Sequence, residues 1–282
     1  MYIEKLLRRI YRFLRENDAT ETTKFFSKDY ASRVAEIRSA HHLNIKKGIL
    51  RADFFNKPQE DSQQDIKGAP RFADDILVGL AKVIRPQCVM QLGCWSLAEL
   101  ETLMFEGVDA RLIATDFNEE YVRFLEGGYR DAGKDDYKFQ TLDIESAGPS
   151  EVEGVVMLSA IQVLANIQPE GMEHFAGTLR ATQSVKCVLI GDNYSWQSID
   201  PRNKQMSLPQ PHVKNWFHNY PLFAELAGFD CVFLPDMILK TNNCSRGVFI
   251  LSRGVPREDI SAATRLAVER FVGRQKHIWL VR

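Results

Sequence analysis

The middle of the chain alternates between short apolar runs and longer mixed segments. The runs are continuous enough to predict strands buried on both faces of a sheet. The runs are CVMQLG (88–93), RLIATD (111–116), YKFQTLDI (137–144), GVVMLSAI (154–161) and KCVLIGD (186–192). Together they predict a buried parallel sheet.

The segments between these runs have helical features. Phe72, Ile76 and Leu80 recur at helical spacing before the first run. Asn118 is a typical helix N-cap, and Gly127–Gly128 predicts where that helix ends. Strands that alternate with helices predict right-handed βαβ units, in which all strands run in one direction.

The end of this region has a different pattern. The runs CVFLPDMIL (231–239) and RGVFILSR (246–253) are separated only by a short polar connection. No helix fits between them, so they are expected to pair as an antiparallel hairpin. An amphipathic helix is predicted for residues 261–272.

The first seventy residues contain no strand signal. Apolar residues of the segment LLRRIYRFLR (6–15) recur at helical spacing among arginines. This basic helix could pack on the body of the protein, contact a second subunit in a homodimer, or lie on an anionic membrane surface. The expected organisation is an N-terminal helical extension (1–70), a Rossmann-like α/β domain (71–252), and a C-terminal helix and tail (253–282).

Composition describes an ordinary globular protein. The 282 residues are 45% hydrophobic and 26% charged, and the net charge of −1 gives no global attraction to nucleic acid. The five cysteines form no CxxC pair, so reduced core thiols are expected rather than disulfides or a metal site. No apolar run is long enough to span a membrane, and no signal peptide is evident. These features predict a cytoplasmic protein.

Two positions have the properties of a nucleoside site. Gly93 ends the first strand run, where the absence of a Cβ lets a ligand approach the backbone. Asp116 ends the second run, and a carboxylate there could accept hydrogen bonds from both ribose hydroxyls. Because Asn118 can cap the following helix, Asp116 is available for a ligand.

With these residues placed, about residues 72–252 resemble the class I S-adenosylmethionine-dependent methyltransferases. The segment MQLGCWSL (90–97) is similar to that family's LDLGCGSG motif, and TDFNEEYV (115–122) to its second-strand motif. The resemblance implies S-adenosyl-L-methionine as the cofactor. It implies a cofactor site that comprises Gln91, Gly93, Trp95, Asp116, Phe117, Asp143, Ile144 and Ser159.

Within this resemblance, three residues have expected contacts to the nucleoside. Phe117 could cover one face of the adenine, Asp143 could accept from its exocyclic amine, and Ile144 is the family's apolar neighbour at that position. Asp143 could instead be an ordinary loop acid. Ser159, together with Gln162, could line the pocket, although strand ends commonly carry polar residues.

The glycine-rich turn departs from the family pattern. Gln91 replaces an acid, and Trp95 and Leu97 replace glycines. Gln91 could still hydrogen-bond to an amino group, whereas the Trp95 indole could fill the site of the methionine moiety. The alternative hypothesis is therefore a catalytically inactive, methyltransferase-like binding protein.

A long irregular segment (191–221) is expected to cover the substrate side, because long loops in compact domains are usually functional. His212 is the first candidate for a general base that takes the acceptor's proton. The other candidates are Asp192, Tyr194, His218 and the pair His41–His42. Each of these side chains could equally stabilise its own loop.

The sequence therefore predicts methyl transfer to a small-molecule acceptor, at a hydroxyl oxygen of a sugar or a secondary metabolite. No NPPY-like motif follows the fourth run, which disfavours methylation of nucleobase amines. A nicotinamide-dependent oxidoreductase is a further alternative. It requires a G-x-G-x-x-G turn, and GCWSLAEL (93–100) does not provide one.

Overall fold

The computed structural model describes residues 72–94, 97–131, 136–147, 157–210, 215–241 and 244–279. The predicted N-terminal helical extension, which contains His41 and His42, lies outside these residues. The helices are α5 (Phe72–Ile84), α6 (Ala98–Phe105), α7 (Glu119–Asp131), η2 (Leu164–Asn166), α8 (Pro169–Ala181), α9 (Tyr220–Ala227) and α10 (Arg257–Trp279). The strands are β1 (Cys88–Leu92), β2 (Arg111–Asp116), β3 (Tyr137–Thr141), β4 (Met157–Ile161), β5 (Cys187–Tyr194), β6 (Ser207–Pro209), β7 (Trp216–His218), β8 (Asp230–Thr241) and β9 (Cys244–Ser252).

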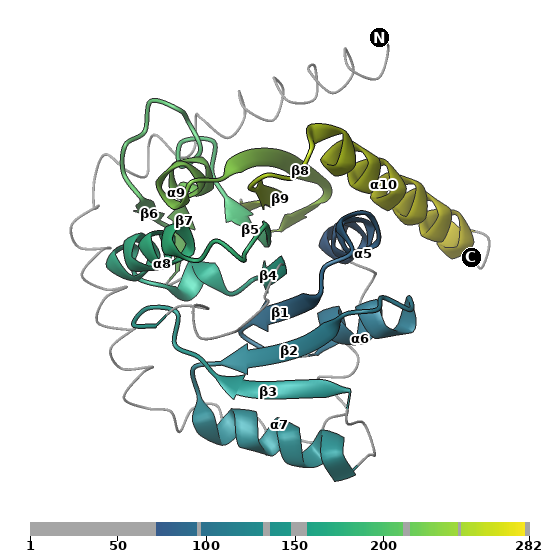
Figure 1. Ribbon diagram of the computed structural model, residues 1–282. Helices are drawn as coiled ribbons and strands as arrows, with labels where there is room; N and C mark the ends of the chain where they lie inside the picture. The colour runs from purple at the N-terminus through teal and green to yellow at the C-terminus, as the bar shows by residue number, and fades with distance from the viewer. Residues whose placement is uncertain are drawn as a thin grey trace.

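The main sheet has seven strands in the order β3-β2-β1-β4-β5-β9-β8. Strands β1 to β5 are parallel, whereas β9 pairs antiparallel with both β5 and β8. Every residue of β1 and β4 is buried, as their continuous apolar runs predict. The expected doubly wound, mostly parallel sheet with a terminal hairpin is confirmed (Figure 1).

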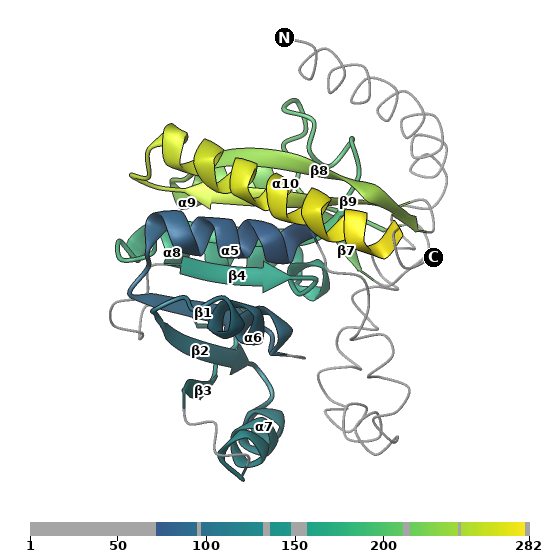
Figure 2. The same ribbon diagram turned by 90° about the vertical axis from the view of Figure 1, so that its right-hand side faces the viewer.

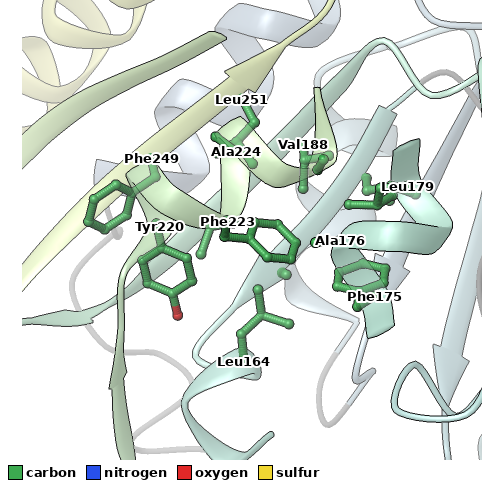
Figure 3. Close-up of a cluster of buried hydrophobic side chains, with 14 of the residues drawn as sticks. Leu164, Phe175, Ala176, Leu179, Val188, Tyr220, Phe223, Ala224, Phe249 and Leu251 are labelled. Atoms are coloured by element: carbon green, nitrogen blue, oxygen red, sulfur yellow. The ribbon is translucent and has the colours of Figure 1, made fainter. Parts of the chain in front are cut away.

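Helices cover both faces of this sheet. On one face, α8 and α9 pack on a core that includes Phe175, Phe223 and Phe249. On the other, α5, α6 and α10 enclose a second core, and both views show α5 beside α10 (Figures 1 and 2). Figure 3 shows part of the first core, in which Tyr220 lies against Phe249 with ring centroids 4.7 Å apart. The result is a three-layer α/β arrangement.

Helix α7 begins as predicted but ends later. The Asn118 side chain accepts a hydrogen bond from the Tyr121 backbone N–H at 3.1 Å, which confirms it as the cap. The helix continues through Gly127–Gly128 to Asp131, so the end predicted at these glycines is wrong. Glycine in a helix interior costs only about 1 kcal/mol relative to alanine, and the Arg130–Glu126 ion pair spans this turn at 2.9 Å.

Other parts of the chain are more regular than the sequence indicates. The long segment after β5 contains a small antiparallel ladder between β6 and β7, in which Ser207 pairs with His218. Helix α10 begins before residue 261 and continues to Trp279. Among the described residues, no helix is long and apolar enough to cross a membrane. Cys88, Cys94, Cys187 and Cys231 are free thiols, as expected.

Candidate functional site at the carboxyl edge of the sheet

Strand β1 lies where the chain changes direction across the sheet. Its connection to β2 passes through α6 on one face, and the connection from β4 to β5 passes through α8 on the other. Because the crossovers diverge there, a crevice for a ligand forms at the carboxyl ends of strands adjacent to this point. In Figure 2 the arrowheads of β2 and β4 point toward this common edge.

Gly93 makes the turn directly after β1. Its φ is +65°, a backbone conformation in which a side chain is strained. A Cβ at this position would lie 2.7 Å from a γ-methyl group of Val163, which follows β4. The next residue, Cys94, donates its N–H to the carbonyl of Thr115 at 2.8 Å. The turn is thus fixed between β2 and the segment after β4, and it requires glycine.

A buried polar cluster lies beside this turn. Gln91 and Ser159 are neighbours in the β1–β4 register, and both side chains are buried. The Ser159 hydroxyl donates to Glu99 Oε2 at 2.6 Å, and Glu99 is itself buried in the first turn of α6. The Thr115 hydroxyl donates to the Gln91 carbonyl at 2.9 Å. Ser159 therefore bonds to an acid that the sequence did not mark as a site residue.

Asp116 ends β2 and is buried, with 3% of its surface exposed. Its Oδ1 accepts a hydrogen bond from the Asn118 N–H at 3.0 Å, which orients the carboxylate over the turn. Asn118, not Asp116, caps α7. A buried carboxylate at the end of a central strand, without a capping role, is well placed to bind hydroxyl donors. Phe117 beside it is half-exposed.

Asp143 follows β3 and is exposed. Its Oδ1 accepts from the Glu145 N–H at 3.0 Å, and its Oδ2 accepts from the Ser146 hydroxyl at 2.8 Å. Both carboxylate oxygens therefore stabilise their own turn. Ile144 is buried in the core beneath α8. This geometry gives Asp143 the loop function that the sequence left open, while its backbone still lies at the same edge as Asp116.

Two of the candidate bases lie in a buried hydrogen-bonded network. Asp192 Oδ2 accepts from the Tyr220 hydroxyl at 2.7 Å and from the Ala165 N–H at 2.9 Å. His218 Nε2 lies 2.7 Å from the Leu164 carbonyl, which can only accept. Nε2 is therefore the protonated nitrogen, and Nδ1 accepts from the Ser207 hydroxyl at 2.6 Å. With both nitrogens bonded, His218 joins β7 to η2.

Burial shifts the pKa of both network residues. It raises the pKa of Asp192 to about 6, opposed by the hydrogen bond from Tyr220. It lowers the pKa of His218 to about 4, opposed by the bond to Leu164. As the pH falls below 6.5, the unfolded state binds a proton at His218 more readily than the folded state does, so the fold loses stability. As the pH falls below about 6, the folded state binds a proton at Asp192 more readily than the unfolded state does, so the fold gains stability. The two effects largely cancel between pH 4 and 6.

Replacing Asp192 by asparagine should make the pH effect of His218 on stability measurable, because the opposite effect of Asp192 is removed. The Asp192→Asn variant is expected to lose roughly 2 kcal/mol more stability than the wild type between pH 6.5 and pH 4.5, since of these two residues only His218 still titrates. Urea unfolding at several pH values measures this difference. The exposed acid Asp230 provides the control substitution Asp230→Asn. Parallel pH profiles for Asp192→Asn and the wild type would contradict the network.

The remaining candidates are either structural or outside the described residues. Tyr194 is buried, and its ring contacts Trp196 and Phe233 with centroids 5.3 and 4.8 Å away. Trp95 and His212 lie outside the residues that the structure describes. Within the described ranges, no cluster of histidine, cysteine and acidic side chains could hold a metal ion. His212 as the base therefore stays a prediction.

No protein-family model and no curated protein matches the chain. Solved structures do match. One is the O-methyltransferase from a trans-AT PKS multienzyme of Brevibacillus brevis in complex with S-adenosyl-L-homocysteine, with a TM-score of 0.53 and 9% identity over 79% of this chain and 89% of that one. Another is magnesium protoporphyrin IX methyltransferase from Synechocystis PCC 6803, with a TM-score of 0.47 and 14% identity over 74% and 99%.

The chain shares the Rossmann-like methyltransferase fold. This fold also argues against the oxidoreductase alternative, because the antiparallel β9 is inserted between β5 and β8. A dinucleotide-binding sheet ordinarily continues in parallel with the order 3-2-1-4-5-6. The methyltransferase resemblance of the sequence and the topology of the sheet therefore agree.

Proposed function

We propose that the protein binds S-adenosyl-L-methionine and transfers its methyl group to a hydroxyl oxygen of a small-molecule acceptor. The observation that carries this proposal is the buried Asp116 carboxylate at the end of β2, beside the glycine turn of β1. The similar O-methyltransferase from Brevibacillus brevis was solved with S-adenosyl-L-homocysteine, which supports the same ligand here. We place this activity in the cytoplasm.

The residues of the site fit such a ligand. Asp116 would accept hydrogen bonds from the ribose hydroxyls, and Phe117, half-exposed, would cover one adenine face. The turn at Gly93, which packs against Val163, would lie beside the methionine moiety. Gln91 and Ser159 are buried beside this turn, and Ser159 fixes Glu99 there. Asp143 and Ile144 would border the adenine through their turn.

When bound, S-adenosyl-L-methionine supplies an electrophilic methyl group and a good leaving group. The protein's main contribution is then to align the acceptor oxygen with the methyl carbon and to exclude water. A base must take the hydroxyl proton as the oxygen attacks. We assign this function to His212 in the segment between β6 and β7, since His218 is buried with both nitrogens bonded.

The alternative is a methyltransferase-like binding protein whose site Trp95 obstructs. The Trp95→Gly variant separates the two hypotheses by its affinity for S-adenosyl-L-homocysteine. Our proposal predicts less than roughly a threefold change in the dissociation constant, because an unobstructed site gains little from the smaller side chain. Tightening of about tenfold or more would instead favour obstruction. Trp95→Leu, which keeps much of the bulk, is the matched control.

A further inference from the structure

An arginine and a strained glutamine flank the end of β5. Gln162 directly follows β4, whose last residue pairs with Gly191 of β5. Arg246 lies near the start of β9, opposite Asn193 of β5. Because β9 runs antiparallel to β5, its start lies at the carboxyl edge of the parallel strands. Both side chains therefore originate at the edge that carries Asp116, on the β4–β5 side of the glycine turn.

The backbone of Gln162 is in an unfavourable conformation. Its φ is +60°, in the left-handed region that residues other than glycine, asparagine and aspartate rarely adopt. Such a conformation costs on the order of 1 kcal/mol or more and persists where the surrounding structure enforces it, commonly at functional sites. Here the Gln162 N–H donates to the Gly191 carbonyl at 2.7 Å. The strain directs an exposed amide side chain toward β9.

The amide of Gln162 contacts the Arg246 guanidinium. In the orientation that satisfies both groups, the amide oxygen accepts from the two terminal nitrogens of Arg246 at 3.0 and 2.8 Å. This partner is neutral, so it orients the guanidinium without cancelling its charge. Among the described residues, Arg246 forms no ion pair with a carboxylate. The charge of Arg246 contributes to lowering the pKa of nearby Asp192, whose oxygens accept from Ala165, Tyr220 and Asn193.

Arg253, which directly follows the other end of β9, differs from Arg246 in its contacts. Arg253 donates to the carbonyls of Leu179 and Ala227 at 2.8 and 3.2 Å, and its guanidinium lies 4.1 Å from the centroid of the Phe229 ring. It thereby joins the ends of α8 and α9. Arg246 makes no comparable bond to a backbone carbonyl within the described residues. A structural role therefore explains Arg253 but not Arg246.

We propose that Arg246, oriented by Gln162, binds an oxyanion group of the acceptor molecule. A guanidinium has five N–H donors in a planar fork, and the contact with Gln162 uses one from each terminal nitrogen. The remaining donors suit a carboxylate or a phosphate group. This inference rests on the proposed methyl transfer and specifies its acceptor: a small molecule with a hydroxyl group to be methylated and an anionic group beside β4 and β5.

The test uses benzoate, phenyl phosphate and the neutral analogue benzamide as probes, titrated into the protein with and without saturating S-adenosyl-L-homocysteine. The wild type is expected to bind at least one anion at millimolar concentration and to bind benzamide more weakly. Arg246→Gln should weaken anion binding roughly tenfold or more, since it removes a charged donor pair. The anion whose binding is lost distinguishes a carboxylate from a phosphate subsite.

A second variant keeps Arg246 in place. Gln162→Glu puts a carboxylate against the guanidinium, so it should also weaken anion binding roughly tenfold while preserving the fold. Arg257→Gln, on the exposed start of α10, removes the same charge at the opposite edge and should leave binding unchanged. The proposal is overturned if neither anion binds the wild type, or if both variants bind anions as the wild type does. S-adenosyl-L-homocysteine binding, measured in the same samples, tests the proposed function separately.

Discussion

Replacement of Asp116 by alanine is expected to weaken the binding of S-adenosyl-L-homocysteine roughly 10- to 100-fold while the protein remains folded. The carboxylate is buried at the end of β2, so no bulk water compensates for the acceptors that the ribose hydroxyls would lose. Isothermal titration calorimetry measures the dissociation constant. The lost turn bond to Asn118 should have only a small effect on stability, because Asn118 itself caps α7.

Two control variants separate the charge of Asp116 from its local contact. Asp116→Asn keeps an oxygen that can accept from the Asn118 N–H but removes the charge, and it should bind with intermediate affinity. Asp109→Ala removes an exposed acid just before β2, at the other end of the strand, and should have no effect. Equal affinity in the wild type and Asp116→Ala would show that this carboxylate does not bind the nucleoside.

Loss of Arg270 should destabilise the fold strongly. Its terminal nitrogens donate to both carboxylate oxygens of Glu106 at 2.8 and 2.6 Å, and its Nε lies 3.3 Å from buried Asp75. These bonds join α10 to α5 and to the end of α6. The Arg270→Met variant takes the guanidinium away from buried Asp75 and leaves Glu106 with Lys82, so it should cost about 3 kcal/mol in urea unfolding.

The pH dependence of the stability of Arg270→Met tests whether the lost ion pair causes the destabilisation. The hydrogen bonds from Arg270 and from Lys82 lower the pKa of Glu106 to about 2, below its usual 4.5. The ion pair therefore stabilises the fold fully above pH 4.5 and progressively less as the pH falls toward 2. The difference between wild type and Arg270→Met should shrink in that window. Arg130→Met, which breaks an exposed ion pair with Glu126, should cost less than about 0.5 kcal/mol.

The sheet could be predicted because each buried strand has a local signature. Continuous apolar runs identify β1, β4 and β5, and the short polar connection between β8 and β9 excludes a crossover helix. The end of α7 was predicted wrongly at Gly127–Gly128, because glycine weakens a helix without ending it where flanking side chains still pair. The β6–β7 ladder could not be predicted because its strands are only three residues long.

Site residues could be predicted only where the position of a single residue in its own strand identifies it. Gly93 and Asp116 follow from their positions at strand ends, and in the structure Gly93 has a positive φ and Asp116 is buried. Glu99 and Arg246 depend on contacts across long stretches of chain, to Ser159 and Gln162. No local pattern encodes such contacts. A glutamate one turn after a glycine loop and an arginine beginning a hairpin strand are weak signals that could have been used.

A structure of the protein with S-adenosyl-L-homocysteine tests the central claim most directly. Both ribose hydroxyls are expected to lie within hydrogen-bond distance of the Asp116 carboxylate, and the methionine moiety is expected to lie against Gly93. A nucleoside bound elsewhere on the protein, or a site at this edge that stays empty at millimolar ligand, would contradict it.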